Sequence, residues 1–175
     1  MILIEPAIEA GMRRKLRQRM LAAFLTGAAE AIRLDGEISV LLTTDKEIRR
    51  LNWEFRHKDK ATDVLSFPAA EPVRGQPRMA GDLAISVETA ARQAQEAGHP
   101  LATEIQVLLL HGLLHLAGYD HETDDGQMAR REAVLRQRLG LAEGLIERSR
   151  TRKGRTEKVG PVKPAKAAAG GGRRR

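Results

Sequence analysis

Apolar residues recur along the chain at two spacings, and each spacing predicts a different kind of element. Short runs rich in Ile, Val and Leu predict strands at residues 2–4, 37–43, 64–67 and 82–86. Apolar residues three or four apart predict helices over residues 8–32, from 45 to at least 55, over 87–97 and 100–116, and from Thr123 to near Gly140. We therefore expect an α/β (α+β) fold in which about five helices pack on a small mixed sheet of about four strands.

Polar residues at the ends of these segments support the same division. Thr44 and Glu47 match a capping box at the start of the second helix, and Ser86 is placed to cap the third. Prolines and glycines between residues 69 and 80 predict a loop. The aromatic residues Trp53, Phe55 and Phe67 fall on a helix face or in a strand, so we expect them in the core.

Charge is distributed unevenly and separates the chain into two parts. The net charge is +7, but residues 148–175 hold 11 Lys or Arg and one acidic residue, whereas residues 1–147 hold 19 basic and 22 acidic residues. The tail has too few apolar residues to fold by itself. We predict a folded domain at residues 1–147 and a disordered basic tail at residues 148–175. This tail either binds polyanions such as RNA through its charge or is a solvated extension.

Cysteine is absent, which excludes disulfides and thiolate metal sites and leaves nitrogen and oxygen as metal ligands. The amino terminus lacks the basic and apolar segments of a secretion signal. The central apolar run at residues 107–110 is far too short to cross a membrane. These features favour a cytoplasmic protein with no membrane partner.

Three of the five histidines lie in the segment 111–121, which reads HGLLHLAGYDH. His111 and His115 are four residues apart, so a helix presents both on one face. Gly118 suits a left-handed turn after the helix, which can return His121 to the same point. A single histidine is more often a hydrogen-bonded core or surface residue, but three at this spacing predict a metal site. Three imidazoles with a fourth position left for solvent are typical of catalytic zinc.

The same segment resembles the zinc-peptidase pattern HExxHxxGxxH in every fixed position except one. Gly112 stands where that pattern has its glutamate, the general base of peptide hydrolysis. The sequence thus lacks a proton acceptor at the position that peptidase chemistry requires. Another hydrolytic reaction at the same kind of metal site is favoured over a peptidase.

Two further blocks accompany the histidine segment: LNWEFRHKDKATDVLSFP at residues 51–68 and GDLAIS at 81–86. Taken together, the three blocks resemble the YbeY family of bacterial endoribonucleases, the rRNA maturation factors, and the resemblance covers about residues 37–140. It implies a zinc-dependent endoribonuclease that prefers single strands and acts in 16S rRNA 3′-end maturation and late ribosome quality control. One Zn²⁺ per chain would be held by His111, His115 and His121, and Arg56 matches the family's functionally important arginine.

Phosphodiester cleavage requires positive charge at the phosphoryl oxygens and an activated oxygen nucleophile. A three-histidine zinc site polarises the phosphoryl group or lowers the pKa of a bound water to about 7. We take His111 and Arg56 as catalytic candidates, because arginine offers a planar fork of donors to a phosphate. No acidic residue stands out as the general base, and the attacking oxygen, from water or a 2′-hydroxyl, is left open. The acids considered are Asp63, Asp82, Glu104, Asp120 and Glu122.

Three functions remain open at this point. The first is the endoribonuclease, with rRNA and the ribosome or small-subunit precursors as partners and with ribosomal proteins or assembly GTPases as further candidates. The second is a non-catalytic ribosome-assembly factor in which the metal only braces the fold. The third is a metal-dependent hydrolase of another substrate. An open metal position favours an enzyme over a brace.

Overall fold

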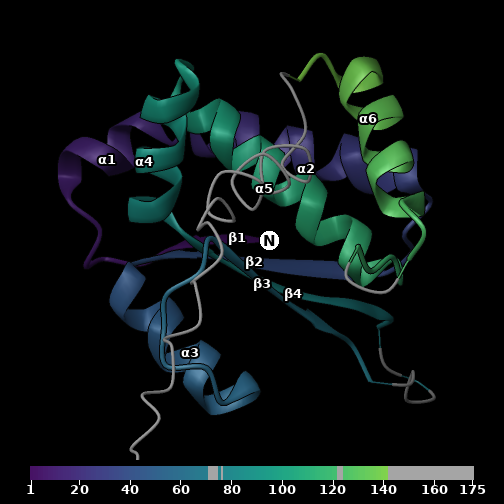
Figure 1. Cartoon of the computed structure of the whole chain (residues 1–175), viewed down its shortest axis with the longest axis horizontal. Helices are drawn as coiled ribbons and strands as arrows, with labels where there is room; N and C mark the ends of the chain where they lie inside the picture. The colour runs from purple at the N-terminus through teal and green to yellow at the C-terminus, as the bar shows by residue number, and fades with distance from the viewer. Residues whose placement is uncertain (71–74, 76, 122–123, 142–175) are drawn as a thin grey trace, which may run out of the picture.

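A four-stranded sheet lies at the centre of the computed structural model, which describes residues 1–70, 75, 77–121 and 124–141 (Figure 1). Its strands are arranged in the order β1-β2-β4-β3, and they are β1 (Ile2–Ile4), β2 (Glu37–Thr43), β3 (Val64–Pro68) and β4 (Met79–Ser86). β1 and β4 run parallel to β2, whereas β3 is antiparallel to β4. The expected small mixed sheet is confirmed. The predicted tail and part of the predicted loop at residues 69–80 lie outside the described residues.

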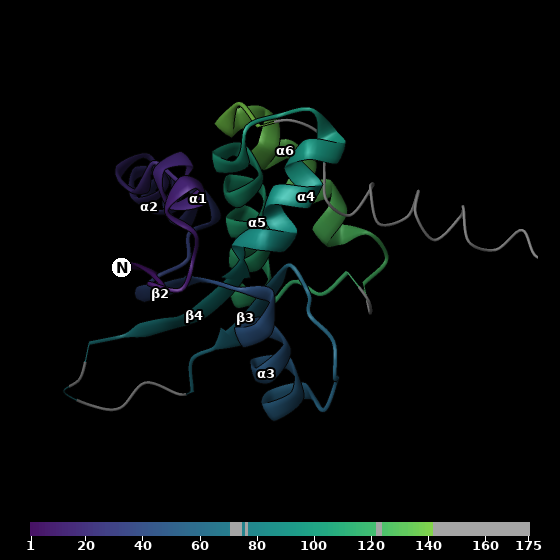
Figure 2. The same ribbon diagram turned by 90° about the vertical axis from the view of Figure 1, so that its left-hand side faces the viewer.

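Six helices are present in the described residues: α1 (Ala10–Lys15), α2 (Gln18–Ile32), α3 (Asp45–Arg56), α4 (Val87–Ala97), α5 (Leu101–Leu116) and α6 (Gln127–Leu139). α3 packs on one face of the sheet, and the other helices lie on the opposite face (Figure 2). α5 is buried along nearly all of its length, as its apolar sequence predicts. The described residues include no helix that is long and apolar enough to cross a membrane.

The helix predicted over residues 8–32 is two helices in the structure. α1 ends at Lys15 and α2 begins at Gln18, because Arg17 between them adopts a left-handed conformation with φ 50°. In an uninterrupted helix, residues five apart, such as Leu16 and Leu21, point about 140° away from each other. The break allows both leucines to be fully buried in the core. The prediction of one continuous helix is wrong, because the apolar pattern does not show which leucines reach the core together.

The last helix starts later than predicted. α6 begins at Gln127 rather than at Thr123, and residue 123 lies outside the described part of the chain. The Asp124 carboxylate accepts hydrogen bonds from the backbone N–H groups of Gly126 and Met128, both at 2.7 Å. The acidic side chain therefore stabilises the positive end of the helix from just outside its first turn. The predicted end at residue 140 is confirmed.

The predicted helix caps are confirmed, and they also join α3 to α4. Thr44 caps α3 and Ser86 caps α4, each by accepting a backbone N–H. Asp45, in the first turn of α3, accepts hydrogen bonds from the hydroxyls of Ser86 and Thr89 and from the Arg92 guanidinium. Burial raises the pKa of Asp45, but these three donors outweigh burial and hold the pKa below its ordinary value. The start of α3 is thus tied to the start of α4.

The aromatic residues of α3 are not in the core. The buried stripe of this helix consists of Ile48 and Asn52, whereas Trp53 and Phe55 are each 57% exposed. Trp53 lies about 140° around the helix from Ile48. Phe55 continues the stripe into the last turn, where its ring meets Phe67 of β3 instead of the core. The predicted core placement is therefore wrong for Trp53 and Phe55, and Phe67 is partly buried.

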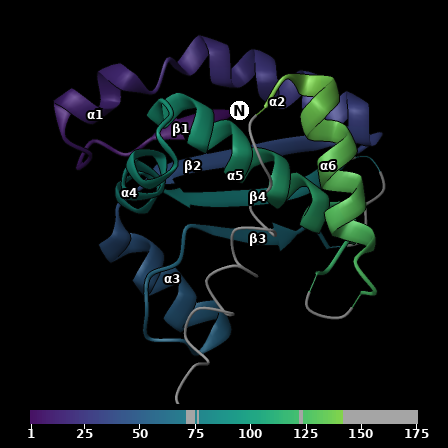
Figure 3. The same ribbon diagram turned by 45° about the horizontal axis from the view of Figure 1, so that its top comes forward.

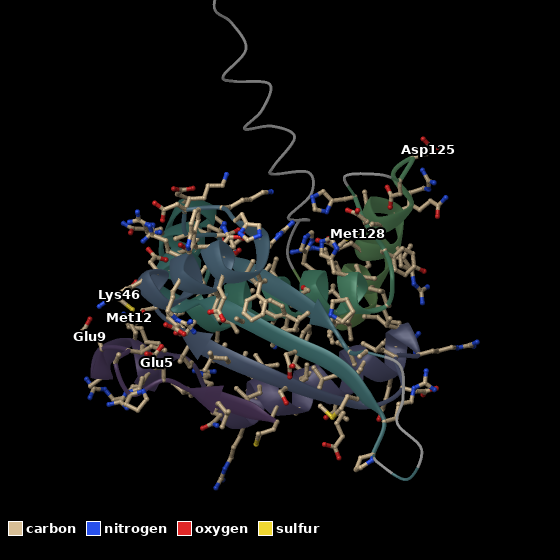
Figure 4. All side chains as sticks on the ribbon, turned by 90° about the horizontal axis from the view of Figure 1, so that it is seen from below. Glu5, Glu9, Met12, Lys46, Asp125 and Met128 are labelled. Atoms are coloured by element: carbon tan, nitrogen blue, oxygen red, sulfur yellow. The ribbon has the colours of Figure 1, made fainter. Side chains whose placement is uncertain are left out.

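The two ends of α5 face different surroundings. Its first turn lies beside α1 and α4, and its last turn lies near the start of α6 (Figure 3). Glu9 and Met12, at α1, and Asp125 and Met128, at α6, mark opposite ends of the molecule (Figure 4). The basic residues of α1 therefore lie at the other end of α5 from the histidine segment.

Candidate metal centre and active-site cleft

Three histidines meet at the C-terminal end of α5. His111 and His115 lie one turn apart on this helix, and their Nε2 atoms are 3.2 Å apart. His121 follows the helix, and its ring centroid lies 5.2 Å from that of His111 and 5.3 Å from that of His115. One ligand nitrogen from each histidine lies within 4.8 Å of the others. The structure therefore brings the three side chains to one point, as their spacing predicts.

Gly118 makes this convergence possible. It has φ 88°, a left-handed conformation that residues with a side chain rarely adopt. The Gly118 N–H donates to the His115 carbonyl and the Tyr119 N–H donates to the Leu114 carbonyl, both at 3.0 Å, which is a Schellman motif. This turn reverses the chain, so that His121 returns to the end of the helix.

Glu132 of α6 orients His111. The Nδ1 atom of His111 lies 3.1 Å from Oε2 of Glu132, and both side chains are buried. Because a carboxylate only accepts hydrogen bonds, His111 donates from Nδ1 and keeps the lone pair of Nε2 directed at His115. The Nη1 atom of Arg136, also buried, lies 3.6 Å from Oε1 of Glu132 and balances its charge. A carboxylate behind a histidine in this way is typical of a metal ligand.

His115 is held in the neutral form that metal binding requires. Burial lowers the pKa of its imidazole to about 4, and the nearby His111 and His121 act in the same direction, whereas Asp120 opposes them. At neutral pH the ring therefore offers a lone pair to a metal ion instead of carrying a second proton.

The geometry and chemistry of the three imidazoles fit a single transition-metal ion. Nitrogen ligands of a tetrahedral zinc ion lie about 3.3 Å apart, because each Zn–N bond is about 2.0–2.1 Å long. The two Nε2 atoms of His111 and His115 already have this separation. Neutral imidazoles suit zinc and other first-row metals. Among the described residues, no fourth His, Cys, Asp or Glu belongs to the group.

Gly112 is required by the packing of α5 on the sheet. A Cβ atom at this position would lie 2.8 Å from Cδ2 of Leu83 and 3.4 Å from Oγ of Ser66. Leu83 is buried in β4 and cannot move aside without disturbing the core. This side of α5 therefore faces the sheet and has no space for a glutamate. The structure thus agrees with the exclusion of a peptidase general base at residue 112.

A cleft of about 720 Å³ opens beside the histidines. Its walls come from the end of α3, the strand β3 and the turn that follows α5. Distant parts of the sequence thus contribute to one cavity. The side chains of chemical interest that line it are Phe55, Arg56, Asp63, Ser66, Phe67, His111, His115, Asp120 and His121.

Arg56 differs from the other arginines of α3. Arg49 pairs with Asp59 at 2.6 Å, and Arg50 pairs with Glu47 at 2.7 Å. Within the described part of the chain, Arg56 makes no ion pair, and its exposed side chain lines the cleft. An exposed guanidinium in the same cleft as three histidines is suited to binding a phosphate.

Two of the acids considered as proton carriers have structural roles. Asp63 accepts a hydrogen bond from the Gln93 side chain at 3.0 Å and also caps the start of β3. Glu104 is buried and pairs with Nε2 of His99 at 3.0 Å, outside the cleft lining. Asp120 lines the cleft and acts electrostatically on His115, so it is a candidate for proton transfer.

Of the two remaining acidic candidates, only Asp82 lies within the described residues, and one important residue was not predicted from the sequence. Asp82 is exposed and does not line the cleft, and Glu122 lies outside the described residues. Glu132 was missed, although it lies on the buried stripe of α6 between Met128 and Leu135. A carboxylate on the apolar stripe of a helix becomes buried on folding and needs a charged or hydrogen-bonding partner there. The position of Glu132 between Met128 and Leu135 therefore already indicated such a buried interaction.

The chain is similar to known proteins over most of its length. A family model described as Endoribonuclease YbeY matches residues 6–140. The chain belongs to the YbeY family. The Endoribonuclease YbeY of Koribacter versatilis is 48% identical over 152 residues, which cover 87% of this chain and 89% of that protein. The Endoribonuclease YbeY of Nautilia profundicola is 51% identical over 115 residues, which cover 66% of this chain and 81% of that protein.

A solved structure shows the same fold. The solution structure of TM1509 from Thermotoga maritima matches this YbeY-family chain with a TM-score of 0.51 and 25% sequence identity, covering 93% of this chain and 100% of the other. The family membership makes the chain an enzyme of the nuclease class, a hydrolase. The resemblance seen in the sequence is thus confirmed.

Proposed function

We propose that this YbeY-family enzyme is a zinc-dependent endoribonuclease that cleaves single-stranded RNA and matures the 3′ end of 16S rRNA in the cytoplasm. One zinc ion per chain would be held by His111, His115 and His121. The observation that carries the proposal is the 3.2 Å separation of two imidazole Nε2 atoms beside a cleft that also contains Arg56. The proposal includes late ribosome quality control, with small-subunit precursors as substrates and with ribosomal proteins and assembly GTPases as partners.

The groups in the cleft, and Glu132 behind His111, each have their own task in this reaction. When bound, the metal would supply positive charge at the phosphoryl group and lower the pKa of a water molecule. Arg56 binds phosphate oxygens and neutralises the negative charge that develops on them in the transition state. Glu132 keeps His111 in the tautomer that presents Nε2 to the metal. Asp120, in the cleft, is the candidate for moving the proton.

Metal analysis combined with single-turnover cleavage tests the proposal. The purified full chain should contain one zinc ion and should cut a single-stranded fragment that carries the 3′ end of 16S rRNA. His111→Ala should lose zinc and cleavage together, whereas Arg50→Ala, on the exposed surface of α3, should keep both. If His111→Ala cleaves as fast as the wild type, a contaminating nuclease accounts for the activity and the proposal fails.

The assembly-factor alternative leads to a different result in the same experiment. A metal that only braces the fold would be lost from His111→Ala with a fall in stability, but neither protein would cut RNA.

The chemistry of the product ends shows which oxygen attacks the phosphorus. Ends with a 5′-hydroxyl and a 2′,3′-cyclic phosphate would identify attack by the neighbouring 2′-hydroxyl, whereas ends with a 3′-hydroxyl and a 5′-phosphate would identify attack by water.

A further inference from the structure

Two phenylalanines form one wall of the cleft. Phe55, in the last turn of α3, and Phe67, on β3, meet edge to face with ring centroids 5.1 Å apart and an interplanar angle of 68°. Both side chains line the cleft that contains Arg56 and the three histidines. Phe55 nevertheless remains 57% exposed. The cleft therefore presents aromatic surface directly beside its positive charge.

The two rings differ in what they contribute to the fold. Phe67 is partly buried against the small core cluster of Ile48, Leu65 and Ala84. Phe55 adds an edge contact to Phe67 but leaves more than half of its own surface in water, where an apolar ring gains no stabilisation from burial. An edge-to-face contact covers at most one face of the Phe55 ring, so this contact leaves at least one face of that exposed ring for a planar ligand.

We propose that Phe55 and Phe67, the aromatic wall of the cleft, stack an unpaired nucleobase of the RNA strand whose phosphate meets Arg56. The inference rests on the proposed function, because it names the part of the substrate that the wall recognises. Arg56 lines the same cleft as Phe55, which places a phosphate-binding group in the same cavity as a base-binding group. A cleft of about 720 Å³ lies within the size range of sites that enclose small ligands.

The aromatic wall also gives a physical reason for a preference for single strands. In a duplex, both faces of an internal base are covered by neighbouring bases, so they are closed to a phenylalanine ring. In a single strand the faces are open, and stacking on one aromatic side chain raises affinity about 5- to 150-fold. Charge alone does not produce this selectivity, because both forms of RNA carry phosphates.

The helix α3 offers a matched control for this proposal. Trp53 is aromatic, lies on the same helix and is also 57% exposed. Its ring contacts His57, with centroids 6.2 Å apart, and it does not line the cleft. Trp53→Leu and Phe55→Leu therefore remove comparable exposed aromatic surface, inside the cleft in one variant and outside it in the other.

The experiment measures binding of a short single-stranded RNA that carries the fluorescent base 2-aminopurine, whose emission is quenched when it stacks. Metal-loaded full-length protein is mixed with the RNA in a stopped-flow instrument, so that binding is recorded before cleavage. Phe55→Leu should weaken single-strand binding about tenfold and abolish the quenching, while binding of a duplex of the same sequence stays within twofold. Phe55→Trp should restore both signals, and Trp53→Leu should behave as the wild type. Thermal unfolding confirms that each variant is folded.

The outcomes separate this inference from the proposed function. If the wild type quenches the 2-aminopurine emission and the quenching persists in Phe55→Leu, the proposed stacking on the aromatic wall is wrong, even if the enzyme cleaves rRNA as proposed. Equal losses of single-strand and duplex binding, or no quenching by the wild type, overturn it as well. Quenching that depends on Phe55 supports the aromatic wall even if the wild type cuts no 16S rRNA fragment, in which case only the proposed function fails.

Discussion

The Nδ1 atom of His111 and the Oε2 atom of Glu132 lie 3.1 Å apart in the protein interior and join α5 to α6. Residues 21 positions apart in the sequence thus form one unit, in which α6 sets the orientation of an imidazole on α5. The second carboxylate oxygen of Glu132 faces the buried Arg136. Packing of α6 therefore controls the histidine group as well as the stability of the fold.

Replacing Glu132 with Gln should weaken zinc binding by about 10- to 100-fold, because an uncharged amide oxygen is a weaker acceptor for the Nδ1–H of His111 than a carboxylate. The change also removes the negative charge that faces the buried Arg136, which should lower the free energy of unfolding by about 3 kcal/mol. Competition with a chromophoric chelator measures the affinity, and urea unfolding measures the stability. Glu54→Gln, on the exposed surface of α3, is the control. An unchanged zinc affinity in Glu132→Gln would show that the negative charge of Glu132 does not contribute to zinc binding.

Replacing Arg56 with Ala should lower the single-turnover rate of RNA cleavage by about 100-fold, because the transition state loses a preorganised cation. Zinc content and the urea midpoint should not change, because Arg56 is exposed and makes no ion pair within the described residues. Arg56→Lys should recover part of the rate, since a lysine restores the charge but not the planar fork of donors. Arg50→Ala serves as the control. Normal cleavage by a folded, zinc-loaded Arg56→Ala protein would remove Arg56 from the mechanism.

Replacing Gly112 with Ala should lower the free energy of unfolding by about 1 kcal/mol. Overpacking against Leu83 costs about 1–3 kcal/mol, and the higher helix propensity of alanine offsets about 1 kcal/mol of it. Adding Leu83→Val should make the Gly112→Ala change less costly, because the shorter side chain makes space for the new methyl group. Urea unfolding of the two single variants and the double variant measures this coupling. Strictly additive effects would show that the two positions do not compete for space.

Asp45 should make stability depend on pH below neutrality. Its pKa is lowered in the folded protein, so its contribution is fully present above its ordinary pKa of about 4 and is lost as pH falls through the lower folded value. Asp45→Asn should lower the free energy of unfolding by about 1 kcal/mol at neutral pH. The difference from wild type should shrink below about pH 4. Urea unfolding at several pH values measures this difference in the free energy of unfolding. The exposed Asp59→Asn is the control and should show a smaller difference from the wild type. A difference that does not vary with pH would contradict the assigned role.

Deleting residues 148–175 should reduce the salt dependence of RNA affinity, because it removes 11 basic side chains. The single-turnover rate at saturating RNA should stay the same, since every described residue that lines the cleft precedes position 122. Titrations between about 50 and 200 mM salt give the slope of log affinity against log salt. Equal slopes for the full and shortened chains would show that the tail makes no contact with RNA.

The features that the sequence predicted well are local ones. The strand at residues 37–43 and the helix at residues 87–97 have the predicted bounds, because a short apolar run, a capping serine and a terminal glycine all act within a few residues. The meeting of His111, His115 and His121 was predictable for the same reason. One helical turn and one left-handed glycine determine where the three side chains lie.

By itself, the sequence determined the element types, the convergence of the histidines and the absence of a glutamate at residue 112. Only the tertiary structure decided that Arg17 breaks a helix, that Glu132 supports His111 and that Phe55 lines the cleft. The physical reason is the distance along the sequence between the residues that interact. Helix period and turn geometry depend on neighbouring residues, whereas burial and the approach of α3, α5 and α6 depend on how distant segments pack against one sheet.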